Sequence, residues 1–441
     1  MKIRSLIVAA FVLLVLAGTL YWSEHRKSGD ETAKASTDTP LRILKLDQAS
    51  ITKIELKKKD TEPIVLTKNN GGSWQITQPK TLNADQSVVS SALSTLSSLN
   101  SERLVEDKAS DLKQYGLDRP SVEVEITGKD NKMQRLQIGD DTPTGSAVYA
   151  ALAGDPRVFT MASFNKTSVD KGLNDLRDKR LLTVSADKIS RLELLRKSQK
   201  VEFGRSKDEW QILKPKPLRA DSAQVGELVT KLTDGRMDLS GSDKDLAEAA
   251  AAFARATPVA TARVTDQSGA QELQVRRNKD TYYAKSSIAE GAYKVDSSLG
   301  QALDKDLDHF RNKKLFDFGF SDPNKIEMHS GMMAYFLTKG GADWWSNGKK
   351  MDAGTVESYI TKLRDLSASK FVESGFANPT IEVTVTSEDG QRVEKVSIEK
   401  SGNSYAAKRE NEPTLYQLDA SALDGLQKAA DDIKPVAASS K

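Results

Sequence analysis

Apolar and polar positions alternate over short stretches in three separate parts of the 441-residue chain. Alternation with a period of two is typical of strands that bury one face. In each part the last strand of the series carries a tryptophan: Trp74, Trp210 and Trp344. Turn-forming segments between the strands, such as the Asn-Gly-rich residues 68–72, predict hairpins. The pattern therefore predicts three antiparallel meanders.

An amphipathic helix is expected after each meander. Asp85, Asp221 and Asp352 each precede apolar residues spaced three and four apart, which places one apolar stripe on a helix. Aspartate caps helix N-termini well because its carboxylate accepts hydrogen bonds from the free amides of the first turn. We therefore assign these aspartates a capping role. A second set of alternating strands follows each helix, and this grouping predicts an α+β fold of antiparallel sheets packed with amphipathic helices.

The three parts are copies of one unit. The Trp-Gln-Ile sequence at 74–76 recurs at 210–212, and the basic segment 177–182 recurs at 311–316. The unit is longer than a solenoid repeat of roughly 20 to 50 residues, so it is the size of a domain. In the second copy an alanine-rich helix around 247–256 replaces a glycine turn. We expect module one at 44–183, module two at 184–317, module three at 318–435 and a disordered tail at 436–441.

The start of the chain differs from the modules. An uncharged apolar run covers residues 5–22 and, as a helix, would reach about 27 Å, close to the roughly 30 Å of a hydrocarbon core. We expect a transmembrane signal-anchor at 1–22 and a flexible tether at 23–43. A cleaved signal peptide with its cleavage site at 15–17 is the alternative. The anchor side chains are Leu6, Phe11, Leu14, Leu20, Tyr21 and Trp22.

No later apolar run would return the chain across a bilayer. We therefore expect a single-pass protein of the bacterial inner membrane, with the bulk of the chain in the periplasm. The lipid bilayer, reached through residues 5–22, is the first expected partner. The charges nearly balance, with 65 basic and 62 acidic residues, so no overall field favours nucleic acid.

Candidate chemistry is sparse. The chain has no cysteine, which excludes disulfides and thiol catalysis, and its three histidines lack metal-ligand spacing. Neither a Gly-x-Ser-x-Gly elbow nor a phosphate-binding glycine loop occurs. We therefore assign no catalytic, cofactor-binding or metal-binding residue.

Two segments are candidates for partner binding. Trp344 and Trp345 are adjacent, so in a strand they point to opposite faces, and we expect one in the core and one exposed. An exposed tryptophan is a common interface anchor. Asp140 and Asp141 lie in the loop 139–145, for which a hairpin turn and a binding site are both considered.

Several short motifs resemble a known family. They are Tyr-Gly-Leu-x-x-Pro at 115–120, Ile-Gly-Asp at 138–140, Thr-Pro at 142–143 and Tyr-Ala at 149–150. With the single N-terminal span, they are similar to an uncharacterised bacterial family that carries a domain-of-unknown-function label. Its members are often encoded beside subunits of gliding-motility-type ABC transporters. The resemblance is best over 44–183 and implies an envelope-facing partner of a membrane export complex, without naming catalytic residues.

These observations favour a membrane-anchored, non-enzymatic accessory or scaffold protein, associated with ABC transporter subunits. A protein that binds an envelope polymer such as glycan is the alternative. A hydrolase with its site between modules is a third possibility.

Overall fold

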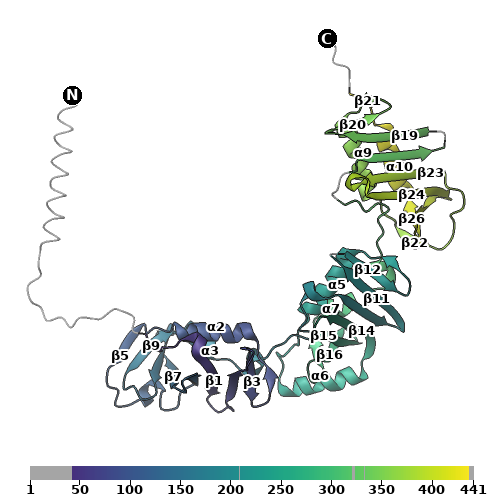
Figure 1. Ribbon diagram of the computed structural model, residues 1–441. Coiled ribbons are helices and arrows are strands. Elements are labelled where there is room, and N and C mark those ends of the chain that lie inside the picture. Colours follow the sequence, from purple (N-terminus) through teal and green to yellow (C-terminus); the bar gives the residue numbers. More distant parts are fainter. Residues whose placement is uncertain (1–41, 208, 320–322, 332, 437–441) are drawn as a thin grey trace, which may run out of the picture. The chain divides into compact units, whose positions relative to one another are not determined.

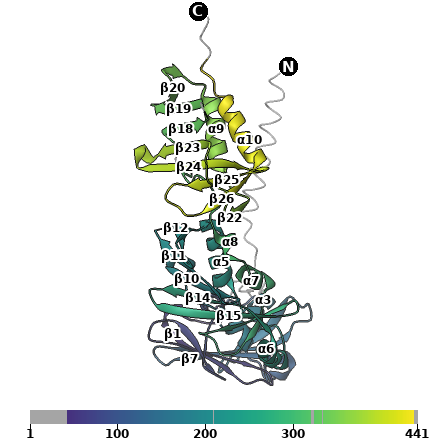
Figure 2. The same cartoon turned by 90° about the vertical axis from the view of Figure 1, so that its right-hand side faces the viewer.

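The computed structural model describes residues 42–207, 209–319, 323–331 and 333–436. It contains three antiparallel sheets with helices packed mainly on one face, and a further helix at 243–255 covers part of the other face of the second sheet (Figures 1 and 2). The predicted α+β fold with repeated modules is therefore confirmed.

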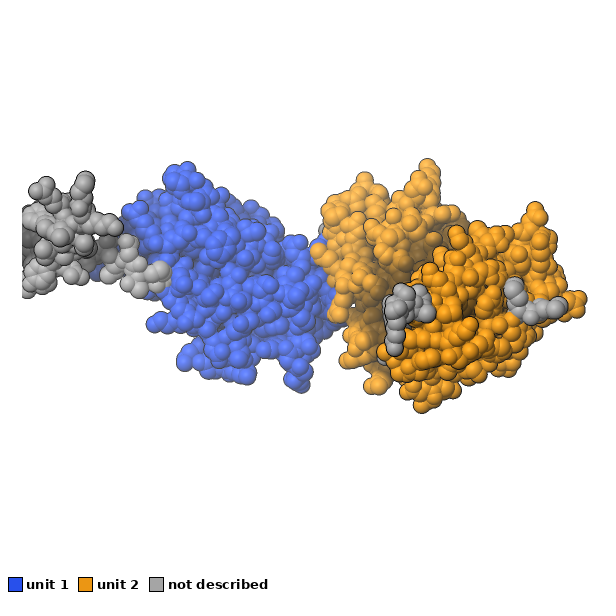
Figure 3. Space-filling view, turned by 90° about the horizontal axis from the view of Figure 1, so that it is seen from above, with its two compact units in different colours: residues 1–178 blue, residues 179–441 orange. Residues whose placement is uncertain are grey.

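The chain divides into two compact units, residues 1–178 and residues 179–441 (Figure 3). The first unit holds the sheet of module one, and the second holds the sheets of modules two and three. The expected anchor at 1–22 and the tether up to residue 41 lie outside the described residues. No helix of the described part is long and apolar enough to span a membrane.

The elements follow the same order in each module. Module one comprises η1 (Gln48–Ser50), β1 (Ile51–Lys58), β2 (Ile64–Lys68), β3 (Trp74–Gln78), β4 (Leu82–Asn83), α2 (Gln86–Ser97), β5 (Arg103–Glu106), η2 (Lys113–Tyr115), β6 (Val122–Gly128), β7 (Met133–Asp141), β8 (Ala147–Leu152), β9 (Val158–Ala162), α3 (Ser163–Val169) and α4 (Leu173–Leu176). Module two comprises η3 (Ala186–Lys188), β10 (Arg191–Arg196), β11 (Gln199–Ser206), β12 (Glu209–Lys214), β13 (Leu218–Arg219), α5 (Ser222–Asp234), α6 (Asp243–Arg255), β14 (Thr257–Asp266), β15 (Gly269–Asn278), β16 (Thr281–Ser286), β17 (Tyr293–Val295), α7 (Ser297–Leu303) and α8 (Leu307–Phe310). Module three comprises β18 (Lys325–Ser330), β19 (Met333–Gly340), β20 (Asp343–Ser346), β21 (Lys349–Lys350), α9 (Ala353–Asp365), β22 (Lys370–Val372), β23 (Ile381–Ser387), η4 (Glu388–Gly390), β24 (Arg392–Ser401), β25 (Ser404–Arg409), β26 (Leu415–Asp419) and α10 (Ala420–Asp431).

Each sheet consists of two antiparallel meanders joined at their first strands. In module one the order is β4-β3-β2-β1-β6-β7-β8-β9-β5, and module three repeats it as β21-β20-β19-β18-β23-β24-β25-β26-β22. Module two runs β13-β12-β11-β10-β14-β15-β16-β17 and has no counterpart of β5. The central pairs β1–β6, β10–β14 and β18–β23 are all antiparallel. The modules are therefore copies in topology as well as in sequence.

The three expected helices begin at the expected caps. The carboxylate of Asp85 accepts hydrogen bonds from the amides of Ser87 and Val88, and Asp221 and Asp352 cap α5 and α9 in the same way. Each helix turns its apolar stripe to the sheet, where Trp74, Trp210 and Trp344 are 7%, 6% and 5% exposed. In module three, α10 lies beside α9 and completes the cover (Figures 1 and 2).

In each module, the segment through which the chain enters is hydrogen-bonded to the second meander at an equivalent position. The amide of Lys45 donates to the Gln134 side chain, and that of Thr183 donates to Gln271. The amide of Asp317 donates in the same way to the carboxylate of Glu394. The described part of the expected tether also belongs to the core, since Ile43 is only 3% exposed. The folded part of module one thus begins before residue 44.

A second segment closes the opposite end of each module. The amide of the capping aspartate donates to Leu176 in module one, to Phe310 in module two and to Lys434 in module three. In modules one and two the chain then continues into the basic segments 177–182 and 311–316. In module three it reaches Pro435, which pairs with Met351. We call the entry end the head of a module, and the end that carries β4, β13 or β21 its tail.

Candidate interaction surfaces

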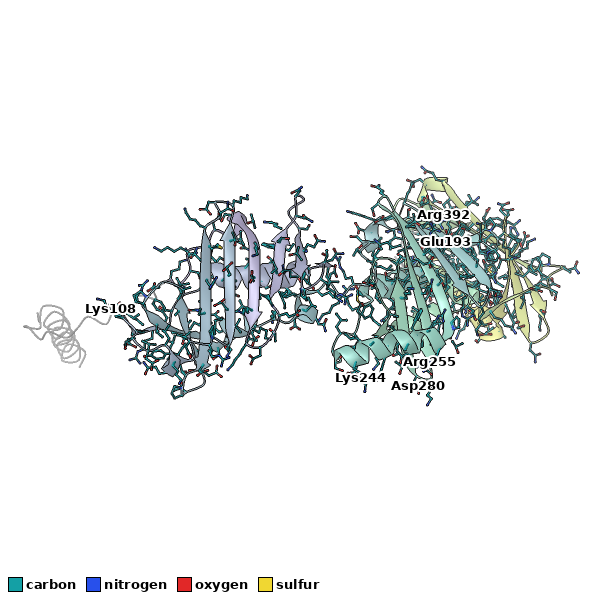
Figure 4. The ribbon with its side chains drawn as sticks, turned by 90° about the horizontal axis from the view of Figure 1, so that it is seen from below. Lys108, Glu193, Lys244, Arg255, Asp280 and Arg392 are labelled. Carbon is teal, nitrogen blue, oxygen red and sulfur yellow. The ribbon has the colours of Figure 1, made fainter. Side chains whose placement is uncertain are left out.

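In each of the first two modules, the sheet face opposite the capped helix (α2 or α5) carries paired charges. In module one, Arg135 lies 2.6 Å from Glu125 across neighbouring strands. In module two, the buried carboxylate of Glu202 lies 2.5 Å from Arg191 and 2.9 Å from Lys214. Glu193, labelled in Figure 4, lies on the same sheet, 2.6 Å from Lys200. These carboxylates are neutralised by neighbours and therefore poorly suited to acid–base catalysis.

Module three carries aromatic side chains on that face instead. By strand register, Phe336 takes the position of Glu202, and Trp345 takes the position of Gln211. Trp345 is 41% exposed and Phe336 is 39% exposed. The Phe336 ring contacts that of His329 edge-on, with centroids 5.5 Å apart. We call Trp345, Phe336 and His329 the aromatic strip.

The two adjacent tryptophans behave as the strand pattern predicts. Trp344 is buried in the core of module three, beside Lys339, whose ammonium group lies 6.0 Å from the ring centre. Trp345 faces solvent. The prediction that one is core and one exposed is confirmed, and the core position of Trp344 removes it as a direct contact for a partner. A binding role for Trp345 stays a prediction.

The motifs of module one meet where the 115–120 loop crosses the end of β7. Gly116 has a φ of +65°, and a Cβ there would lie 2.5 Å from the Asp140 carboxylate. A Cβ on Gly139 would lie only 2.0 Å from the carbonyl oxygen of Tyr115. The carbonyl oxygen excludes a side chain at Gly139, so this glycine allows the close approach of two backbones, whereas Gly116 supplies the positive φ. The motifs that carry the family resemblance are thus packing motifs.

The tyrosine of the first motif is held by a carboxylate. Its hydroxyl donates to Glu106 at 2.9 Å, and this hydrogen bond, with burial, raises the pKa of Tyr115. The rings of Tyr115 and Tyr149 lie 4.9 Å apart. These residues form a small second core with the buried Leu117.

Asp140 and Asp141 do not converge on a binding site. Loop 139–145 closes as a turn, because the amide of Thr142 donates to Ala147 and that of Gly145 donates to Thr142. Asp141 lies 3.5 Å from Lys166, in a pair where the aspartate is 65% exposed. The structure therefore brings the two aspartates to a hairpin, and their role in partner binding stays a prediction. Among the described residues, no group of three or more potential metal ligands occurs.

The other modules cover the same region differently. In module three, Glu399 stands at the position of Gly139, and its carboxylate accepts hydrogen bonds from the amides of Ala377 and Asn378. In module two, α6 lies across β15, β16 and β17 and buries Phe253 against Tyr283 (Figure 4). The alanine-rich helix expected in copy two is confirmed, and it substitutes for the glycine-dependent loop.

Modules two and three meet through partly buried charged side chains. Arg219, at the end of β13, lies 3.1 Å from the Asp317 carboxylate and 2.9 Å from that of Glu412. It also donates to the hydroxyl of Tyr416 at 3.1 Å and to the carbonyl of Lys314 at 2.5 Å. Burial raises the pKa of Tyr416, so this hydroxyl stays protonated. One side chain from the tail of module two thus joins three elements at the head of module three.

A second arginine reinforces the contact. The guanidinium of Arg311 lies 3.4 Å from the ring centre of Phe371 and donates to Thr414 at 3.4 Å. A cleft of about 570 Å³ remains beside it, lined on the module-two side by Gln211 and Arg219. Sequence reasoning missed this arrangement. The sequence did contain one signal. Leu218 repeats Leu82 of module one, but the residue after it is the cation Arg219, where module one has Asn83.

Two stretches of the chain, residues 74–214 and residues 210–380, match the family described as Domain of unknown function (DUF4340). Together they span 74–380, which is well over half of the 441 residues. The chain belongs to this family. Each match begins at the tryptophan strand of one module and runs into the next, so the DUF4340 unit includes a junction between modules. No curated protein matches, and no solved structure matches.

Proposed function

We propose that this DUF4340 protein is a non-enzymatic accessory protein, anchored in the bacterial inner membrane, whose three modules present binding surfaces in the periplasm. The observation that carries the proposal is the repetition of one fold three times, with modules two and three joined through Arg219 and Arg311. Tandem modules of one kind extend a surface for binding and need no reaction centre.

The polar side chains of the described part support this reading. Glu202 is bound by Arg191 and Lys214, and Glu394 is bound by Arg392 and Arg409. The two cations beside Glu202 lower its pKa, so it is a weak general base. These charges are accounted for by the packing of the sheets.

The membrane location and the partner are supported by sequence. Residues 5–22 have the length and composition of an anchor. The family resemblance, through the gene neighbourhood of its members, points to an ABC-type export complex. We propose its permease and ATPase subunits as the partners.

Binding of an envelope glycan is the second candidate. The aromatic strip of module three favours it, because exposed rings on a flat sheet face stack on sugar rings, and Trp345 is 41% exposed. A hydrolase with a site in the cleft between modules two and three is less favoured. Three acids line this cleft, Glu209, Asp221 and Asp317. Two of them have structural partners, because Asp221 caps α5 and Asp317 is bound by Arg219 and Asn312.

The test is purification of the tagged chain from native membranes after chemical crosslinking, followed by identification of the co-purifying proteins. We expect the permease and ATPase in near-stoichiometric amounts. The matched control lacks residues 1–22 and should recover neither. Recovery of the intact chain alone would contradict the proposal, and recovery with envelope polymer only would favour the glycan alternative.

A further inference from the structure

The head of module one and the tail of module three have the features of the two sides of the junction between modules two and three. At that junction, β13 of module two contacts the loop at 410–414 of module three. The central residue of this loop is Glu412, which is followed by Pro413.

Module one has the same loop at its own head. Strand pairing aligns Ala150 and Phe159 with Ala407 and Tyr416, so residues 153–157 correspond one to one to residues 410–414. Asp155-Pro156 therefore stands where module three has Glu412-Pro413. The residue before the acid has positive φ in both loops, 84° at Gly154 and 65° at Asn411.

Module two lacks this loop chemistry. Its pairing of Ala284 with Tyr293 places Ala289-Glu290 at the position of the acid and the proline. The acid–proline loop is thus shared by module one and module three, and in module three an arginine from another module binds it. In module one the Asp155 carboxylate pairs with Arg157 of the same loop at 2.6 Å, and the Arg157 side chain is 39% exposed. A partly exposed pair of this kind can be exchanged for a cation of another chain at small cost.

The tail of module three carries the matching cation. Lys350 in β21 takes the position of Arg219 in β13, because both pair with the strand that carries the tryptophan. Both residues of β21 are exposed, whereas both residues of β13 are partly covered. Lys350 pairs with the half-exposed Asp343 at 2.8 Å. Such a pair can be exchanged at small cost.

An apolar anchor lies beside this cation. Trp345 takes the position of Gln211, which lines both cavities of the junction between modules two and three. Replacement of glutamine by an exposed tryptophan suits a contact made without a covalent link, because a buried aromatic ring supplies much of the energy of an interface.

We propose that the tail of module three binds the head of module one of a second copy of this chain. Lys350 binds the Asp155-Pro156 loop, and Trp345 packs beside it. The contact continues the order of modules from one chain into the next. The two surfaces differ, so the contact is heterologous and can repeat from one chain to the next. The proposal does not depend on the export-complex partner.

The test uses the full chain in detergent micelles, and the absence of native cysteine makes engineered thiols the only ones. Ala153→Cys with Lys349→Cys, two exposed positions that leave Asp155 and Lys350 in place, is treated with a short bis-maleimide crosslinker. We expect a ladder of dimers and larger products. The control pair, Phe164→Cys with Val393→Cys, is also exposed, at 69% and 60%, and should remain monomeric.

Adding Trp345→Ala to the reactive pair should reduce the crosslinked fraction about tenfold, which corresponds to about 1.4 kcal/mol. Thermal melts of each variant establish that it is folded. A yield no higher than that of the control pair would overturn the proposal. So would a product within one chain, or equal crosslinking by Lys349→Cys alone, which would indicate tail-to-tail contact.

Discussion

Replacing Arg219 by alanine should weaken the contact between modules two and three more than any other single surface change. The substitution leaves the carboxylates of Asp317 and Glu412 without their shared cation and removes a donor to Tyr416. The side chains of Arg219 and Glu412 are each 21% exposed. Breaking a fully buried pair costs about 3–5 kcal/mol, and breaking an exposed pair costs about 0–1 kcal/mol. For this intermediate exposure we expect about 2–3 kcal/mol.

Differential scanning calorimetry of the full chain measures the loss. In a unit of this size, about 1 kcal/mol lowers the melting temperature by about 2–4 °C, so the transition of modules two and three should move down by about 4–12 °C. Trypsin should also cut the basic segment 311–316 faster, because the interface that covers it opens more often.

Arg135→Ala is the matched control. Arg135 is also paired with carboxylates, Glu123 and Glu125, but it is 46% exposed on the open face of module one. We expect a loss of at most about 1 kcal/mol. Equal shifts for the two variants, or no shift for Arg219→Ala, would refute the assignment of Arg219 as the residue that joins the modules.

Three further outcomes test the packing and the charges. Gly139→Ala should destabilise module one by more than about 2 kcal/mol, because its Cβ would meet a carbonyl oxygen at 2.0 Å. Gly226→Ala, at an open helical position, should stabilise module two by about 0.5–1 kcal/mol. Urea titration measures the free energy of unfolding of both variants. Trp344→Ala should cost about 3–5 kcal/mol and Trp345→Ala less than about 1 kcal/mol, so similar losses would contradict the assignment of core and surface. The hydrogen bond from Lys214, together with that from Arg191, lowers the pKa of Glu202 below its ordinary 4.5, although burial of the carboxylate acts in the opposite direction. Its stabilisation is therefore complete above pH 4.5 and lost as the pH falls through the lowered pKa; Glu202→Gln should flatten the melting temperature in that acid range.

The repeated fold could be predicted from the sequence because the signals for its strands and helices are local in each module. The period of two, the capping aspartates and the tryptophan strands are signals within a few residues of one another. Trp345 could also be placed on a surface, because adjacent residues of a strand face opposite ways. The same local reasoning could not decide which tryptophan was buried until the register with Trp74 and Trp210 was known.

The junction could not be predicted in this way. Arg219 and Glu412 lie far apart in the chain, and 65 basic and 62 acidic residues offer too many possible pairs. Only the register of the strands brings β13 to the loop at 410–414. For the same reason the glycines of module one were recognised as motifs before their function in packing was visible. Asp140 beside Gly116 is a contact between two loops, and neither loop predicts it alone.

The proposed location of the modules outside the cytoplasm supports the anchor, the partner and the glycan alternative together, so it is the claim to test first. Phe164→Cys places a single exposed thiol on module one of a chain without native cysteine. Intact spheroplasts are treated with a membrane-impermeant maleimide. The account predicts labelling without lysis, to the same extent as after permeabilisation. Labelling only after lysis would place the modules in the cytoplasm and contradict the proposed function.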